Sequence, residues 1–210
     1  MEAIHPARSL PSGASLDDAR AAAAVCTACD LYARATMTVF GEGRAHVPLM
    51  LVGEQPGDRE DRAGEPFVGP AGALLDRALV DAGIDRERVF VTNVVKHFKW
   101  RPSPDGKRRL HERPNQGEIR ACRPWLDLER ELVRPDLLVA LGATAAQAII
   151  GRDFRITERR GEIVALDGGP PVIATFHPSA ILRARTPEDR ERMSAALVGD
   201  LALAAAHVAG

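Results

Sequence analysis

Short apolar runs alternate along the chain with segments whose apolar residues recur at helical spacing. Each run is long enough for one buried strand, and the four runs span residues 48–52, 89–95, 136–141 and 172–176. Helical spacing marks residues 16–25, 74–82, 118–133, 143–150 and 187–208. Strand and helix in this order predict an α/β fold, in which three layers, α/β/α, contain a central and mostly parallel sheet of four strands.

The segments between these elements carry weaker patterns. Residues 1–15 lack periodicity and predict a loose N-terminal arm. Ser15, the last residue of this arm, is a suitable N-cap for the first helix. Residues 53–61 predict a glycine- and acid-rich turn, and residues 155–166 predict a hairpin or a bent pair of strands. Pro124 predicts a break within the helix over residues 118–133.

Length and composition favour one continuous core. With 210 residues, of which 45% are hydrophobic, we expect a single domain over residues 1–210. The longest apolar runs are strand-sized and far shorter than a membrane span. The N-terminus has no charged region followed by an apolar stretch, so we expect no signal peptide, no membrane partner and a cytoplasmic location.

Positive charge is concentrated in one segment. Between Lys96 and Arg123 there are nine Lys or Arg residues and three acids, a local excess of +6 in a chain of formal net charge −1. Such a patch suits an anionic partner such as a phosphate backbone, and a basic loop kept soluble by its charge is the alternative. At its centre lies Lys-Arg-Arg-Leu-His, residues 107–111, which the surrounding prolines predict to be a loop.

Three cysteines, Cys26, Cys29 and Cys122, make a disulfide framework improbable in a chain expected in the cytoplasm. The spacing of Cys26 and Cys29 is common to zinc, redox and iron–sulfur sites. A lone pair at this spacing is a weak indication, and three buried thiols without a metal are the alternative.

The strand order brings several unusual segments to one edge of the predicted sheet. In parallel α/β sheets, ligands bind beyond the carboxyl ends of the strands. The segments that follow the first, second and fourth strands are the acid-rich turn, the region from Asn93 to His111, and His177-Pro178-Ser179. We therefore expect these three segments to share one rim of the sheet.

Four motifs in this order resemble the uracil-DNA glycosylase superfamily, and within it the iron–sulfur family 4. They are Gly-Glu-Gln-Pro-Gly at residues 53–57, Pro-Phe-Val-Gly-Pro-Ala-Gly at 66–72, Thr-Asn-Val-Val-Lys at 92–96 and His-Pro-Ser at 177–179. The resemblance covers most of the chain, from Cys26 to about Leu201. Gln55 and the insertion at residues 107–111 look like the UdgX-type branch, whose members become covalently joined to DNA through the histidine of that insertion.

One departure from family 4 concerns the metal site. That family has a cysteine after the lysine of the third motif, where this chain has His97. The resemblance to the UdgX-type branch implies a [4Fe–4S] cluster held by Cys26, Cys29, His97 and Cys122. Histidine replaces cysteine in some iron–sulfur sites, and zinc would also accept this set of ligands.

The resemblance also implies a pocket for a flipped uracil. Phe67 is the expected stacking platform, with core packing as its alternative role. Asn93 matches the N3–H donor and O4 acceptor of uracil, although it could instead cap a turn. His177 is expected to donate to the uracil O2, or else only to orient its loop. Backbone amides complete the pocket around Gln55, Gly57 and Asp58.

Cleavage of the glycosidic bond leaves an electrophilic C1′ on the sugar. We expect His111 to attack this carbon while Glu54 takes its other proton or sets its tautomer, which would leave the protein attached to the abasic sugar. Arg109 is expected to lock the loop. Phosphate contacts are expected from Lys107, Arg108, Ser179 and Arg183.

Two other functions fit the same residues. One is a multiple-turnover glycosylase in which a carboxylate activates water. The other is a non-catalytic nucleic-acid sensor with a structural or redox-responsive cluster. The expected partner is uracil-containing DNA, single- or double-stranded, with free uracil as product, and the chain is expected to act as a monomer.

Overall fold

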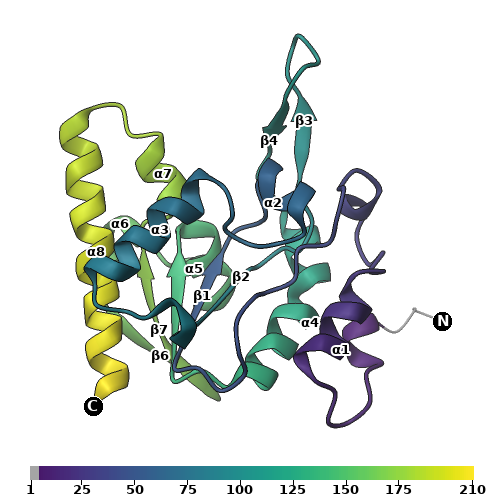
Figure 1. Cartoon of the computed structure of the whole chain (residues 1–210), viewed down its shortest axis with the longest axis horizontal. Helices are drawn as coiled ribbons and strands as arrows, with labels where there is room; N and C mark the ends of the chain where they lie inside the picture. The colour runs from purple at the N-terminus through teal and green to yellow at the C-terminus, as the bar shows by residue number, and fades with distance from the viewer. Residues whose placement is uncertain (1–4) are drawn as a thin grey trace.

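The computed structural model describes residues 5–210 and contains a five-stranded sheet in the order β2-β1-β5-β7-β6 (Figure 1). The four predicted strands are present and mutually parallel, as expected. The prediction of four strands was nevertheless wrong, because β6 adds an antiparallel edge next to β7. The strands are β1 (Leu49–Gly53), β2 (Val89–Asn93), β5 (Leu137–Leu141), β6 (Ile163–Leu166) and β7 (Gly169–Thr175).

Helices cover both faces of this sheet, which gives the three predicted layers. Side chains of β1 alternate, so that Leu49 and Leu51 enter one hydrophobic core and Met50 and Val52 enter the other. The first core is closed by α3 (Pro70–Asp81), α7 (Pro178–Leu182) and α8 (Pro187–Ala209). The second is closed by α1 (Leu16–Ala23), α4 (Gln116–Val133) and α5 (Ala143–Ile149).

The C-terminal helix α8 is long and apolar enough, by composition alone, to cross a membrane. In the fold it packs against α3, α7, β5 and β7. Leu197, Leu201 and Ala204 of this helix are fully buried in the core. One side of α8 is therefore part of the core, while 22% of its apolar window is buried.

Several connecting segments differ from their predictions. The turn expected over residues 53–61 becomes helix α2 (Asp58–Ala63), whose first turn carries acidic residues that favour a helix N-terminus. Residues 155–166 form α6 (Ile156–Arg159) followed by β6 rather than two paired strands. Pro124 does not break α4, which continues because Trp125 and neighbouring residues pack on the core.

The N-terminal arm also differs from its prediction. Pro6–Arg8 form the 3-10 helix η1, which packs on α1 and α4, and Ala7 is buried. Pro6–Arg8 are thus part of the packed structure, while Pro11, Ser12 and Gly13 are exposed and residues 1–4 lie outside the described residues. Ser15 caps α1 as predicted, because its side chain accepts a hydrogen bond from the Asp18 backbone N–H. A second 3-10 helix, η2 (Asp30–Ala33), follows the first two cysteines.

The basic segment predicted as a loop is a two-stranded hairpin of β3 (Trp100–Pro102) and β4 (Arg109–His111). Proline has no backbone N–H and is therefore excluded from a central strand. In a separate hairpin each strand has an open edge, where the missing N–H costs little. Trp100 pairs with His111 at its base, and Gly106 takes a positive φ of 70° in its turn. The hairpin rises from the carboxyl end of the main sheet, above α2 (Figure 1).

Candidate active site

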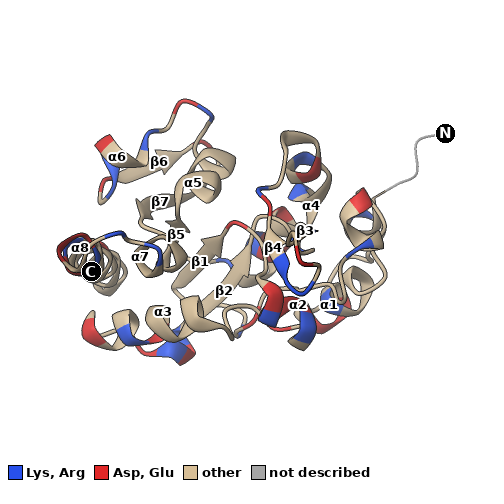
Figure 2. Cartoon of the chain, turned by 90° about the horizontal axis from the view of Figure 1, so that it is seen from above, with Lys and Arg blue, Asp and Glu red and all other residues tan. Residues whose placement is uncertain are grey.

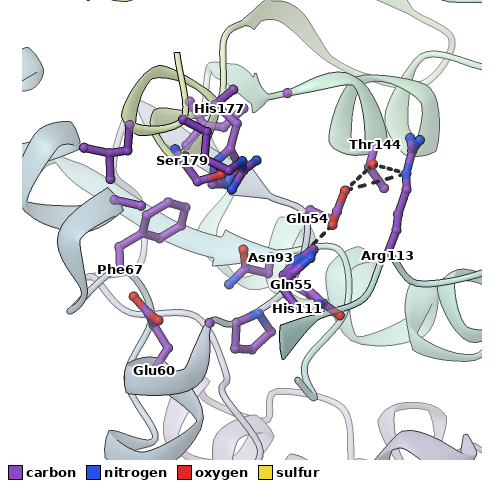
Figure 3. Close-up of a pocket in the computed structure, with 18 of the residues that line it drawn as sticks. Glu54, Gln55, Glu60, Phe67, Asn93, His111, Arg113, Thr144, His177 and Ser179 are labelled. Atoms are coloured by element: carbon purple, nitrogen blue, oxygen red, sulfur yellow. Dashed lines mark hydrogen bonds and ion pairs between the residues drawn. The ribbon is translucent and has the colours of Figure 1, made fainter. Parts of the chain in front are cut away.

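The four parallel strands end at one edge of the sheet and surround a cavity of about 770 Å³, which we call the rim pocket. This volume suits a small organic ligand. Side chains reach the rim pocket from the ends of β1, β2, β5 and β7, from β4 of the hairpin and from the loop between α2 and α3 (Figure 3). They include Glu54, Gln55, Phe67, Asn93, His111, Thr144 and His177. The expectation that three segments share one rim is confirmed, and the end of β5 joins them.

Phe67 and Asn93 approach each other over a glycine. A Cβ atom on Gly53 would collide with the Asn93 carboxamide oxygen and lie 2.9 Å from Phe67 Cζ. Phe67 itself has a positive φ of 58°, unusual for a residue with a side chain, and Gly72 packs directly on its carbonyl. The buried carboxylate of Glu60 accepts the Gly69 N–H at 2.8 Å and supports the same loop. Phe67 is thus held at the rim pocket rather than in the centre of a core.

Asn93 ends β2 and is almost fully buried. Its side chain lies in the rim pocket between Phe67 and Gln55 (Figure 3). Within residues 5–210, no group hydrogen-bonds its carboxamide. A buried amide in this state is ready to bind a ligand that offers both a donor and an acceptor.

His177 lies opposite, directly after β7, with its ring stacked 6.1 Å from the ring of Phe67. Its Nδ1 accepts the Ser179 backbone N–H at 3.0 Å and lies 2.8 Å from Ser179 Oγ. Burial lowers the pKa of His177 to about 4, so the imidazole is neutral at neutral pH. A neutral ring that accepts at Nδ1 carries its proton on Nε2, which makes His177 a hydrogen-bond donor toward the rim pocket.

Glu54 connects the sheet to the hairpin. Its Oε1 lies 3.2 Å from His111 Nε2, and its Oε2 accepts a short hydrogen bond from the Thr144 hydroxyl (Figure 3). Arg113 Nε donates to the same hydroxyl at 2.9 Å. Burial acts to raise the pKa of Glu54, but the hydrogen bonds from His111 and Thr144 outweigh it and lower this pKa below its ordinary value. Glu54 is therefore a carboxylate that faces an imidazole.

Two predicted pocket residues direct their side chains to the hairpin. The Gln55 carboxamide donates to the carbonyl oxygens of Lys99 and Glu112 at 3.2 and 3.1 Å and accepts the Lys99 N–H at 3.1 Å. Asp58 forms an ion pair with Arg109. The backbone of Gln55, Gly57 and Asp58 still borders the rim pocket.

Arg109 joins the hairpin to α2. Besides Asp58, it contacts the fully buried Asp61 at 2.6 Å and the Thr36 hydroxyl at 3.0 Å. Its guanidinium also lies 5.4 Å from the ring centroids of Phe98 and Trp100. These contacts fix the base of the hairpin, and with it His111.

The other predicted DNA-contact residues are placed differently. Lys107 and Arg108 are exposed at the hairpin turn, and Arg183 is exposed after α7. Ser179 instead bonds His177. The basic excess counted along the sequence is partly neutralised in the fold, because Arg109 is paired as above and Lys96 is buried 2.7 Å from Glu129. Charges of both signs lie around α2 and the hairpin (Figure 2).

The predicted metal ligands lie on the other side of the hairpin base, where α1, residue 97 and α4 meet. Cys26 and Cys122 are buried, and Cys29 is partly buried. Burial raises the pKa of the Cys122 thiol to about 12. Within residues 5–210, no three His, Cys, Asp or Glu side chains converge as the ligands of a single ion would.

The chemistry around these sulfurs nevertheless fits a cluster. The Trp125 indole N–H donates to Cys26 Sγ at 3.2 Å, and the Lys96 backbone N–H donates to Cys122 Sγ at 3.2 Å. Such N–H donors typically surround sulfur ligands and tune the metal that they bind. Burial lowers the pKa of His97, which keeps its ring neutral as a ligand must be.

Sequence reasoning missed Thr144 and Arg113. Thr144 opens α5, directly after β5, and Arg113 follows the hairpin. The available indication was position: β5 pairs with β1 in parallel, so residues beyond Leu141 emerge beside Glu54. Neither residue carries a motif, which explains why the third strand was left out of the predicted rim.

The fold and the rim pocket define an α/β protein whose sheet is covered on both faces and whose pocket lies at the carboxyl ends of the parallel strands. A family model described as the uracil DNA glycosylase superfamily matches residues 40–202. The chain belongs to this superfamily.

Individual relatives agree. The type-4 uracil-DNA glycosylase of Thermotoga maritima is 44% identical over 166 residues, which are 79% of this chain and 82% of that protein. Those of Pyrobaculum aerophilum and Archaeoglobus fulgidus are 38% and 37% identical, over 75% and 80% of this chain and 80% and 83% of theirs. The resemblance noted from the motifs is therefore confirmed at the level of the type-4 enzymes.

Proposed function

We propose that this chain excises uracil from DNA and then remains covalently attached to the abasic sugar through His111. The observation that carries the proposal is the contact between Glu54 Oε1 and His111 Nε2, 3.2 Å, at the edge of a pocket suited to a base. Ordinary hydrolysis needs a carboxylate and water, whereas an imidazole beside that carboxylate is a stronger nucleophile. Membership of the superfamily and the type-4 relatives support the excision step.

Recognition of the base uses the described geometry. The flipped uracil would stack on Phe67, and the carboxamide of Asn93 would pair with its N3–H and O4. The Nε2–H of His177 would donate to O2, where negative charge collects as the glycosidic bond breaks. Backbone N–H groups at Gln55, Gly57 and Asp58 would complete the contacts.

The proposed reaction breaks one bond to C1′ and forms another. The N1–C1′ bond breaks, and its electron pair leaves with the uracil, which later takes a proton from water. A ring nitrogen of His111 donates its lone pair to C1′, and the other ring nitrogen transfers its proton to Glu54. An imidazole bonded to C1′ is a poor leaving group, so the adduct is proposed to persist and each protein molecule to react once.

Covalent attachment has a direct test. Protein is mixed with excess uracil-containing oligonucleotide, single- or double-stranded, and heated in denaturant before electrophoresis. We expect a shifted band that forms one-to-one with protein, together with an equal amount of free uracil, and no band with a thymine oligonucleotide. Free uracil in large excess over protein without the band would instead establish a multiple-turnover enzyme that activates water with Glu54. If neither the shifted band nor free uracil forms, the chain is a non-catalytic nucleic-acid sensor.

Cys26, Cys29, His97 and Cys122 are proposed to hold a [4Fe–4S] cluster. The N–H groups that donate to two of the sulfurs and the neutral imidazole support this assignment. When bound, such a cluster cross-links the N-terminal segment to α4 and can carry one electron. Iron and acid-labile sulfide should each approach four per chain in protein purified without oxygen, whereas a colourless preparation that contains zinc would contradict the assignment.

A further inference from the structure

Glu54 keeps its Oε1 toward His111 only if another group binds its second carboxylate oxygen. That second oxygen, Oε2, accepts the hydroxyl proton of Thr144. The hydroxyl oxygen of Thr144 accepts in turn from Arg113 Nε at 2.9 Å, so the hydroxyl makes one donor and one acceptor contact, and its proton is committed to Glu54. The hydrogen bonds therefore run in one direction, from Arg113 through Thr144 to Glu54.

The position of Thr144 is determined by the main sheet. β5 ends at Leu141, Gly142 adopts a positive φ of 89°, and Thr144 lies in the first turn of α5. Because β1 and β5 are adjacent and parallel, this turn lies beside Glu54. Thr144 is buried, with 6% of its surface exposed, so its hydroxyl has few alternative partners. His111, by contrast, belongs to a separate hairpin and is half-exposed.

We propose that Thr144 is a positioning residue for the covalent step, which orients the Glu54 carboxylate so that one oxygen is reserved for His111. The inference rests on the proposed function for its consequence in catalysis. Without the Thr144 hydroxyl, Oε2 would lose its buried donor and the carboxylate would turn toward the Arg113 guanidinium, now 3.8 Å away. His111 would then lose the acceptor that orients its ring, and water would capture C1′ more often.

The charged and titratable groups that face Glu54 come from three directions. They are Arg113 after β4 and the two titratable imidazoles, His111 on β4 and His177 after β7, of which His177 is neutral at neutral pH. Thr144→Val removes only the hydroxyl and leaves these three groups in place. The hydrogen bond from Thr144 favours the charged carboxylate, so its loss should raise the pKa of Glu54.

The experiment compares three variants with the wild-type protein. Thr144→Val removes the hydroxyl, and Thr144→Ser retains it. Thr175→Val is the matched control, because Thr175 is also fully buried at the end of a parallel strand but its Oγ1 has no partner within residues 5–210. One measurement follows adduct formation over time and gives its rate and the fraction of cleaved DNA that ends as adduct. The other is the titration of the Glu54 carboxyl by carbon-13 NMR, assigned by its loss in Glu54→Gln.

We expect Thr144→Val to form adduct about 10- to 100-fold more slowly, to release more free abasic DNA, and to titrate Glu54 at higher pH. Thr144→Ser and Thr175→Val should match the wild type in both measurements. An unchanged Glu54 titration in Thr144→Val, or a Thr144→Ser protein as impaired as Thr144→Val, would overturn the inference. A wild-type protein that forms no adduct would refute the proposed covalent function instead, and the NMR titration would still decide the role of Thr144.

Discussion

Two histidines face the rim pocket, and they are supported in opposite ways. His177 follows a strand of the main sheet, its Nδ1 is hydrogen-bonded to Ser179, and burial keeps it neutral. His111 lies on a hairpin outside that sheet, half-exposed, with Glu54 as its polar contact. A donor that stabilises charge works best when it is already in place, whereas a nucleophile needs an accessible ring and an acceptor for the proton of its other nitrogen. The surroundings of His177 suit its proposed role as a hydrogen-bond donor, and those of His111 suit its proposed role as a nucleophile.

The sharpest test of this comparison removes the proposed nucleophile. His111→Ser should abolish the denaturation-resistant band completely while uracil is still released, because recognition and departure of the base depend on the main sheet. Free uracil and shifted band are quantified in one reaction. His207→Ser, at an exposed position in the last turn of α8, is the control. A band that survives in His111→Ser would assign the attachment to another residue.

Removal of the other histidine should slow both products together. His177→Ala deletes the donor aimed at O2, and loss of one such donor costs about 10²- to 10³-fold in rate. Ser179→Ala keeps the backbone N–H that bonds His177 Nδ1 and should cost far less. Single-turnover uracil release measures both variants. If His177→Ala changed only the fraction of adduct, the division of tasks between the two histidines would be wrong.

The attachment of the hairpin to α2 is tested through Arg109. Arg109→Ala leaves the buried carboxylate of Asp61 without its cation and should lower the free energy of unfolding by about 2 kcal/mol. Adduct formation should fall about 100-fold, since His111 loses its fixed position. Arg108→Ala, at the exposed neighbouring position, should change stability by less than about 0.5 kcal/mol. Equal losses in both variants, measured by denaturant unfolding, would refute the specific role of Arg109.

The smallest effect is expected at the hairpin turn. Replacement of Lys107 and Arg108 by alanine removes two exposed charges without disturbing His111. If both contact phosphates, the slope of log affinity against log salt should become shallower by about 1.5. Binding of a uracil-free oligonucleotide at several salt concentrations measures this slope. An unchanged slope would show that these residues do not contact the DNA backbone.

The main sheet was predictable because each strand is buried on both faces. Such strands appear as continuous apolar runs, and β1, β2, β5 and β7 were all recognised in this way. The edge strand β6 is partly exposed and has a mixed pattern, so it was expected only as part of a bent pair. The hairpin was missed because Pro102 and Pro104 argue against a strand, although both occupy positions that an isolated pair of strands tolerates.

The site was predictable only where residues form motifs. Phe67, Asn93 and His177 were placed at one rim by motif and strand order, and they line one pocket. Gln55 was expected to contribute its backbone amide, and it does line the pocket, but no motif indicated that its carboxamide binds the backbone of the hairpin. Thr144 was not expected at all, because a threonine in the first turn of a helix has no distinctive pattern.

The sequence by itself determined the layers, the parallel strands and the edge at which a ligand binds, because burial and strand direction follow from local patterns of apolar residues. Only the tertiary structure decided which charges remain available and which side chains meet. Arg109 is neutralised by acids about 50 positions away, and Thr144 reaches a carboxylate 90 positions away. Such contacts depend on how separate strands pack, which no local pattern encodes.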